Sequence, residues 1–108
     1  MTETRKRIDF VAVKGATVYT AELKLTNWKE ALGQAFTNLF YADYSYVALW
    51  HKAVRNVDRT LFEQSGIGLI EVNGRCVERI RPRQSTMVIP EKHQYLVAYH
   101  REKRRAHD

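Results

Sequence analysis

The alternation of apolar and polar positions predicts that the chain opens with a β-hairpin. Between Arg7 and Leu25, apolar residues recur at every second position on both sides of Lys14-Gly15. This is the pattern of two half-buried strands around a tight turn, and glycine at the second loop position favours a short hairpin. One apolar set is expected to face a covering helix: Ile8, Phe10, Tyr19, Ala21, Leu23 and Leu25.

The next pattern has the period of a helix. Apolar residues at three- and four-residue steps predict an amphipathic helix over residues 27–42, capped by Thr26 or Asn27, with its apolar face on the hairpin. Residues 45–50 form an apolar run without alternation, which is typical of a central parallel strand. Strand, helix and strand therefore predict a parallel crossover.

Shorter elements follow in the second half of the chain. A helix is predicted over residues 54–65, with Gly66 as its C-cap, followed by a strand over 67–72. Asn73-Gly74 is a strong hairpin signal, and the returning strand over 75–81 is basic.

The C-terminal part is predicted as a loop and a helix. Residues 82–89 resemble a linker, and Pro90 begins a helix over 91–105 with Tyr95, Leu96 and Tyr99 as its apolar face. The whole pattern predicts an α/β fold, a mixed sheet of about four or five strands with flanking helices. We divide it into a core over 1–83 and a linker with a basic helix over 84–108.

Three charged residues interrupt the apolar hairpin: Asp9 on the first strand, and Glu22 and Lys24 on the second. Charges are costly in a sheet unless they pair or do chemistry. A two-residue loop at Lys14-Gly15 would pair Asp9 with Thr20, whereas a four-residue loop would put Asp9 opposite Glu22. Both even-length loops leave the three charges on one face of the hairpin.

Two interpretations of these charges stay open. Neighbouring carboxylates repel unless a cation lies between them, and magnesium prefers oxygen ligands of this kind. Lys24 could then stabilise negative charge or orient a water. Alternatively, the trio forms a surface cross-strand salt bridge, worth well under about 1 kcal/mol.

The run Asp9, twelve residues, Glu22-Leu23-Lys24 and then a helix carrying Gln34 resembles the PD-(D/E)xK nuclease superfamily over about residues 7–82. Archaeal Holliday-junction resolvases and Mrr-like restriction endonucleases belong to this superfamily. The resemblance implies a restriction endonuclease-like fold and metal-dependent cleavage of DNA phosphodiester bonds.

The resemblance also implies a role for each matching residue. Asp9 and Glu22 would bind Mg²⁺ (or Mn²⁺), with the backbone carbonyl of Leu23 as a further ligand. Lys24 would assist the attacking water, and Gln34 would help to position it or contact DNA. Without the resemblance, Gln34 would be interpreted as an ordinary exposed helix residue.

Two features depart from the family pattern. Ile8 stands where the motif has proline, and only eight residues precede Asp9. Relatives begin with a helix and a strand ahead of the aspartate-bearing strand, and Glu3 is a poor substitute for the acidic residue that this helix often supplies. The chain is therefore expected to be a minimal or truncated nuclease, a homodimer or partner complex that completes its core, or a degenerate member.

Composition fits a polyanionic partner. The net charge is +6 with a pI near 9.7, which suits DNA as a partner. Such a charge indicates affinity for DNA that does not depend on the base sequence. Two basic groups could contact phosphate, although a solvated terminus and a helix-dipole role are the plainer explanations. They are Arg5, Lys6 and Arg7 in the first group, and Arg101, Arg104 and Arg105 in the second.

The remaining composition bears on the compartment. Cys76 is the single cysteine, which excludes an internal disulfide and fits a cytoplasmic protein. No signal peptide or membrane-length apolar run is present. A Mg²⁺-dependent DNA endonuclease is thus the first hypothesis; the alternatives are a non-catalytic nuclease-fold module that binds DNA or protein, and a dimeric structural or regulatory protein.

Overall fold

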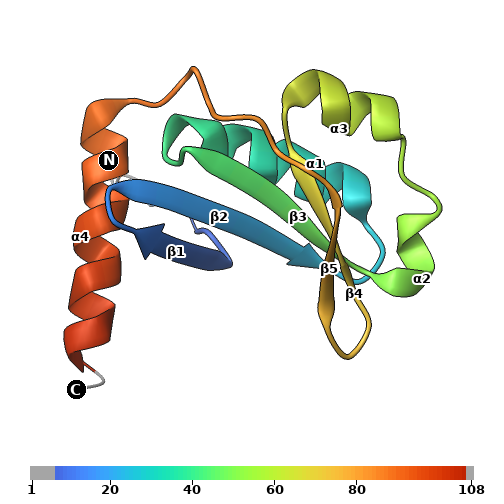
Figure 1. Cartoon of the computed structure of the whole chain (residues 1–108), viewed down its shortest axis with the longest axis horizontal. Coiled ribbons are helices and arrows are strands. Elements are labelled where there is room, and N and C mark those ends of the chain that lie inside the picture. Colours follow the sequence, from blue (N-terminus) through green and yellow to red (C-terminus); the bar gives the residue numbers. More distant parts are fainter. Residues whose placement is uncertain (1–6, 107–108) are drawn as a thin grey trace, which may run out of the picture.

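The structure, a computed structural model, describes residues 7–106, with side chains up to residue 103. Figure 1 shows its helices and strands. In order they are β1 (Phe10–Lys14), β2 (Thr17–Lys24), α1 (Trp28–Thr37), the 3-10 helix η1 (Asn38–Phe40), β3 (Tyr44–Trp50), α2 (His51–Val54), α3 (Arg59–Ser65), β4 (Gly68–Val72), β5 (Cys76–Ile80) and α4 (Pro90–Ala106).

The strands form one mixed sheet in the order β1-β2-β3-β4-β5. β2, β3 and β4 run parallel, and an antiparallel strand flanks them on either side. The apolar run of β3 lies at the centre, where a strand is shielded on both edges. The α/β fold with a mixed five-stranded sheet is therefore confirmed.

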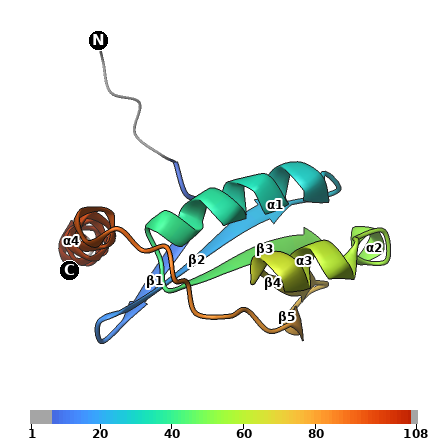
Figure 2. The ribbon, with the colours of Figure 1, turned by 90° about the horizontal axis from the view of Figure 1, so that it is seen from above.

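The helices α1, α3 and α4 pack on the same face of the sheet. α1 and α3 share a core with Val47 and Leu49 of β3, and Trp28 of α1 approaches Phe62 of α3 with ring centroids 6.1 Å apart. α4 packs on the hairpin end of this face, where Leu96 contacts a small core around Val18 (Figure 2). We call this face of the sheet the covered face.

The covered face is the opposite of the one predicted from the hairpin. Phe10, Leu23 and Leu25 are 58%, 53% and 73% exposed, while Thr20 and Glu22 on the other side of β2 are buried. The reason lies in the parallel ladder, which pairs Glu22 with Val47 and so puts Glu22 in the layer beneath α1. Both sides of the hairpin carry apolar residues, so its own pattern does not decide which side a helix covers.

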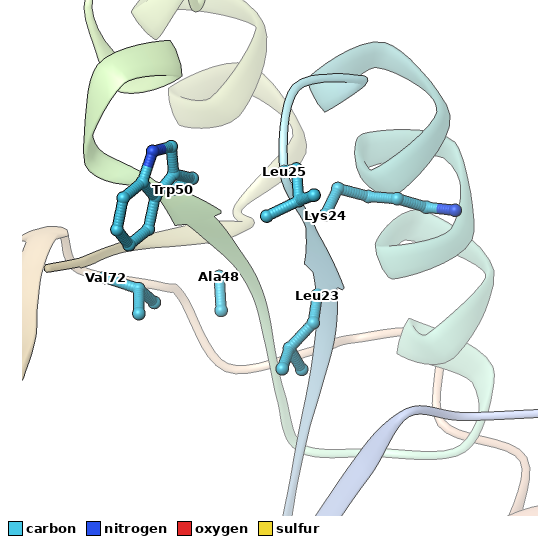
Figure 3. Close-up of a pocket in the computed structure, with 6 residues that line it drawn as sticks. All are labelled: Leu23, Lys24, Leu25, Ala48, Trp50 and Val72. Atoms are coloured by element: carbon cyan, nitrogen blue, oxygen red, sulfur yellow. The ribbon is translucent and has the colours of Figure 1, made fainter. Parts of the chain in front are cut away.

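The opposite side of the sheet, which we call the open face, carries no described helix. On β1 to β4 its four central rows are uncharged: Phe10, Ala12, Tyr19, Ala21, Leu23, Tyr44, Tyr46, Ala48, Trp50, Gly68, Ile70 and Val72. A shallow pocket of about 200 Å³ lies at one end, between Leu25, Trp50 and Val72 (Figure 3). An apolar sheet face of this extent is usually covered in a folded protein.

The helix predicted over residues 54–65 begins only at Arg59, as α3, and the separate short helix α2 lies before it. α2 ends at Val54 and α3 begins at Arg59, because the Asp58 side chain accepts a hydrogen bond from the Thr60 N–H (3.0 Å) and caps a new helix. Gly66 does end α3 in the left-handed conformation, with φ of 76°.

The segment between β5 and α4 is held to the body by hydrogen bonds. The Arg83 N–H donates to Gly66 O (3.0 Å), the Ser85 hydroxyl donates to Leu39 O (2.6 Å), and the Ile89 N–H donates to Phe40 O (2.9 Å). α4 was predicted to bury Tyr95, Leu96 and Tyr99; it buries Leu96 and Val97, and both tyrosines are exposed.

Candidate functional site

Asp9 lies directly before β1, at the edge of the sheet. The hairpin pairs Lys14 with Thr17 and Phe10 with Ala21, so the same register continued by one step puts Asp9 opposite Glu22. Asp9 opposite Glu22 is the pairing that the four-residue loop predicts. In the structure Lys14 and Thr17 also pair, so the turn itself has only two residues, Gly15-Ala16. The Asp9 carboxylate accepts a hydrogen bond from the Leu23 N–H at 3.0 Å.

The hydrogen bond also indicates where the Leu23 carbonyl points. In a strand, the N–H and C=O of one residue point to the same side, which here is the side of Asp9. The Leu23 side chain points the other way and is exposed on the open face (Figure 3). A carboxylate and a backbone oxygen therefore lie at the same point of the sheet edge.

Glu22 is buried on the covered face, with only 2% of its surface exposed. The Asn38 amide donates to one carboxylate oxygen of Glu22 at 2.9 Å. A buried carboxylate is costly unless it is hydrogen-bonded or paired with a cation. Asn38 supplies one such partner from the end of α1.

Lys24 follows on the same side of β2 and points toward α1 (Figure 3). Its ammonium group contacts the Glu30 carboxylate at 2.6 Å. The hydrogen bond to Glu30 raises the pKa of Lys24, desolvation lowers it in part, and the negative charges of Glu30, Asp9 and Glu22 raise it further. Lys24 is therefore a cation at neutral pH, near both acids, and is not a proton acceptor there.

Gln34 belongs to a polar row on the helix. Glu30, Gln34 and Asn38 recur at four-residue steps, which places them on one side of the helix. Glu30 contacts Lys24 and Asn38 contacts Glu22, so Gln34 lies between two helix residues that reach β2. We call this set, with Thr20, Glu22 and Lys24 of β2, the polar layer.

Three oxygen atoms of the polar layer are buried and have no hydrogen-bond partner within the described protein: Thr20 Oγ1, Gln34 Oε1 and Asn38 Oδ1. Gln34 is thus more than an ordinary exposed helix residue. The carboxylates of Asp9 and Glu22 and the buried amide oxygens are potential metal ligands of the oxygen type that a hard divalent cation such as Mg²⁺ prefers. No group of three or more histidine, cysteine or acidic side chains with metal-binding geometry occurs in residues 7–106. A Mg²⁺ ion would therefore need the two carboxylates together with backbone and amide oxygens.

The predicted basic residues are only partly brought to this site. Arg7 lies in one groove with Asp9, whereas Arg101 is exposed on α4 and does not line that groove. Arg5 and Lys6 lie outside the described residues, and so do the side chains of Arg104 and Arg105.

Sequence reasoning missed three members of the polar layer: Thr20, Glu30 and Asn38. The signal for Glu30 and Asn38 is present in the sequence, because they lie four residues before and after Gln34 and form a polar row with it along the flank of the apolar stripe. Thr20 precedes Glu22 by two residues and therefore shares its face.

Comparison with known proteins supports the fold alone. No protein-family model matches the chain, and no curated protein matches it. Among solved structures, the chain is similar to the SPO1766 protein of unknown function from Silicibacter pomeroyi, with a TM-score of 0.65 and 14% identity. The match covers 91% of this chain and 67% of that chain. Within residues 7–106, no helix is both long enough and apolar enough to cross a bilayer.

Proposed function

We propose that this protein is a metal-dependent nuclease that hydrolyses a phosphodiester bond of DNA. Asp9 carries the proposal, because its carboxylate meets the backbone of Leu23 between Glu22 and Lys24. Those residues also carry the resemblance to the PD-(D/E)xK nucleases. The proposed cation ligands are Asp9, Glu22 and the Leu23 carbonyl, with Mg²⁺ or Mn²⁺ supplying charge that polarises the phosphate and activates water.

Each remaining residue has a role that suits its environment. Lys24 stays protonated, so it would stabilise negative charge on the phosphate rather than accept a proton. Gln34 has a buried amide oxygen without a protein partner, which could orient the attacking water. Basic surface would provide affinity for the backbone that falls steeply with salt. A cytoplasmic location is part of this proposal.

The test pairs cleavage with metal binding. Wild-type protein should cut duplex, branched or single-stranded DNA in Mg²⁺, and Lys24→Ala should abolish cutting while folding and DNA affinity are kept. Lys29→Ala is the matched control, because Lys29 is exposed beside the site and lies over Trp28. In calorimetry, Asp9→Asn should lose Mg²⁺ binding. Cleavage that persists in Lys24→Ala would contradict the proposal.

One observation favours the second candidate, a non-catalytic nuclease-fold module. Lys24 is held by Glu30, and Glu22 is held by Asn38 and almost completely buried. A site locked in this way could serve as a structural layer beneath a DNA- or protein-binding surface. In that case the wild type would bind DNA without cutting it, and Mg²⁺ titration would give no heat that depends on Asp9.

We also propose a homodimer, with a second copy covering the open face. A strand spacing of about 4.8 Å and a rise of about 3.3 Å per residue give its central rows a footprint of roughly 500 Å² in projection. Each partner of a standard interface buries about 800 Å² in total, so this face with its rim would suffice. The central rows carry no charge, so two copies could meet there about a two-fold axis without repulsion between like charges.

A further inference from the structure

A groove of about 410 Å³ separates the start of β1 from α4. Asp9 lines it, so the groove opens directly beside the proposed catalytic site. One wall belongs to the hairpin, and the other is formed by residues one turn apart on α4. The residues that line it are Arg7, Ile8, Asp9, Val11, Tyr95, Leu96, Tyr99 and Lys103.

The α4 wall is an aromatic ladder that ends in a cation. Tyr95 and Tyr99 lie with ring centroids 6.2 Å apart and an interplanar angle of 22°, and the Lys103 ammonium lies 5.2 Å from the centre of the Tyr99 ring. The tyrosines are 40% and 39% exposed, so ring surface remains accessible to a ligand. Tyrosines that only anchored α4 would be buried like their neighbours Leu96 and Val97.

The charges of the groove indicate what could bind there. Arg7 and Lys103 lie on opposite walls, and both are exposed cations that can pair with phosphate. Aromatic rings next to cations match a nucleotide, whose base stacks and whose phosphate is neutralised. In a duplex the bases stack on one another and present only their edges, so a tyrosine ring can stack on an unpaired base alone.

We propose that this groove binds an unpaired nucleotide of the nucleic-acid strand that the proposed function would cut. The base stacks on Tyr95 and Tyr99, and Arg7 and Lys103 hold the flanking phosphates. The inference rests on the proposed function for the role of Asp9, and it adds a substrate class. Substrates would be single-stranded or would carry an unpaired segment next to the scissile phosphate.

Binding of a fluorescently labelled oligo-dT strand to the full-length protein in EDTA tests this without cleavage. Replacing both tyrosines by leucine keeps their apolar contacts and removes stacking, and should weaken binding about tenfold or more, since stacking contributes about 1–3 kcal/mol per base. Replacing both by phenylalanine keeps the rings and should retain affinity. Phe36→Leu is the control, because Phe36 is an exposed aromatic on α1 outside the groove. Circular dichroism checks that each variant folds.

The expected pattern is loss in the leucine variant, retention in the phenylalanine variant, and duplex affinity that is equal in all of them. Equal single-strand affinity in the leucine and phenylalanine variants would overturn the inference, as would an equal loss for duplex, or no binding of the oligo-dT strand by wild type. The result is separable from the proposed function. Ring-dependent binding without any cleavage would support the groove and contradict the nuclease, whereas Lys24-dependent cleavage without ring-dependent binding would do the reverse.

Discussion

At the scale of single residues, Glu22 is the most demanding group in the protein. It is a carboxylate beneath a helix, in a row of the sheet whose next members are Val47 and Leu69. An apolar residue would fill this position at no electrostatic cost. Asn38 lies completely buried beside it and donates to it, so the helix supplies a polar group where the strand requires one. The local cost of Glu22 is understandable if the carboxylate has a chemical task.

Asn38→Ala is therefore expected to destabilise the protein by about 1–3 kcal/mol, because it removes a hydrogen-bond donor from a buried carboxylate. Urea unfolding followed by circular dichroism measures the loss. Thr37→Ala is the matched control, since the neighbouring Thr37 is exposed and bonds only to Gly33 O in its own helix. Equal stabilities of the two variants would show that the Asn38 contact is not needed to keep Glu22 buried.

Because of Tyr46, the free energy of unfolding is expected to change with pH in the alkaline range. Burial raises the pKa of Tyr46 above its ordinary 10.0, and the hydrogen bond that its hydroxyl donates to Glu78 (2.7 Å) raises it further. The unfolded chain then ionises first, so the contribution of Tyr46 is complete below about pH 10 and is lost as the pH rises beyond it. Wild type should exceed Tyr46→Phe in free energy of unfolding by about 0.5–1.5 kcal/mol near neutrality. That difference should shrink above about pH 10, and a constant difference would contradict the pKa argument.

At the scale of elements, two glycines show how differently a helix and a sheet respond to one added carbon. A Cβ at Gly33, in the middle of α1, meets nothing within 4 Å. A Cβ at Gly68, in β4, would lie 2.7 Å from the Tyr46 ring and 2.9 Å from Pro82. Gly33→Ala should stabilise the protein by about 1 kcal/mol, because alanine is the better helix former.

Gly68→Ala should destabilise it by about 1–3 kcal/mol through overpacking against Tyr46 of β3 and Pro82, which follows β5. Thermal or urea unfolding of both variants checks the opposite signs. In a Tyr46→Ala background, which lacks the clashing ring, Gly68→Ala should cost less than it does in the wild type. An equal cost in both backgrounds would place the strain at Pro82 or in the backbone of β4 instead.

The elements could largely be predicted from sequence, because each is a local pattern. The hairpin, the long helix and the apolar β3 follow from periodicity, and Asn73-Gly74 lies between β4 and β5. The covered side of the hairpin could not be predicted, because it depends on the pairing of Glu22 with Val47, a contact between segments 25 residues apart. The gap between α2 and α3 depends on the cap at Asp58, a local signal that the apolar period hides.

The candidate site likewise has a part that could be predicted from local sequence patterns and a part that depends on contacts between distant segments. Alternation alone predicts Asp9, Glu22 and Lys24 on one face. In the structure Glu22 and Lys24 share a side of β2, whereas Asp9 lies just before β1 and accepts a hydrogen bond from the Leu23 N–H. The polar row on α1 required knowledge of which helix side meets β2. The groove beside Asp9 required the position of α4, which packs on a hairpin about 80 residues earlier in the chain through Leu96 and Val97.

At the scale of the whole molecule, one side of the sheet is occupied and the other is not. Figure 2 shows the arrangement of α1, α3 and α4, which all pack on the covered face. The polar layer and the groove lie on the same face. The open face has a different composition, with aromatic and aliphatic residues in every central row. The proposed catalytic site and the proposed dimer interface would therefore lie on opposite faces of the sheet. A dimer formed through the open face would not cover the proposed site.

The dimer proposal predicts a mass that depends on concentration. Leu23→Lys places a charge in a central row of the open face and should convert dimer to monomer in analytical ultracentrifugation, because an unpaired charge at an interface centre is costly. Leu61→Lys is the matched control: Leu61 is 43% exposed on α3, outside the open face, and its variant should dimerise as wild type does. Both positions are exposed in the monomer, so neither lysine should disturb the fold, and both variants should give the circular dichroism spectrum of the wild type. A wild-type protein that is monomeric at all concentrations would show instead that this sheet tolerates an uncovered apolar face.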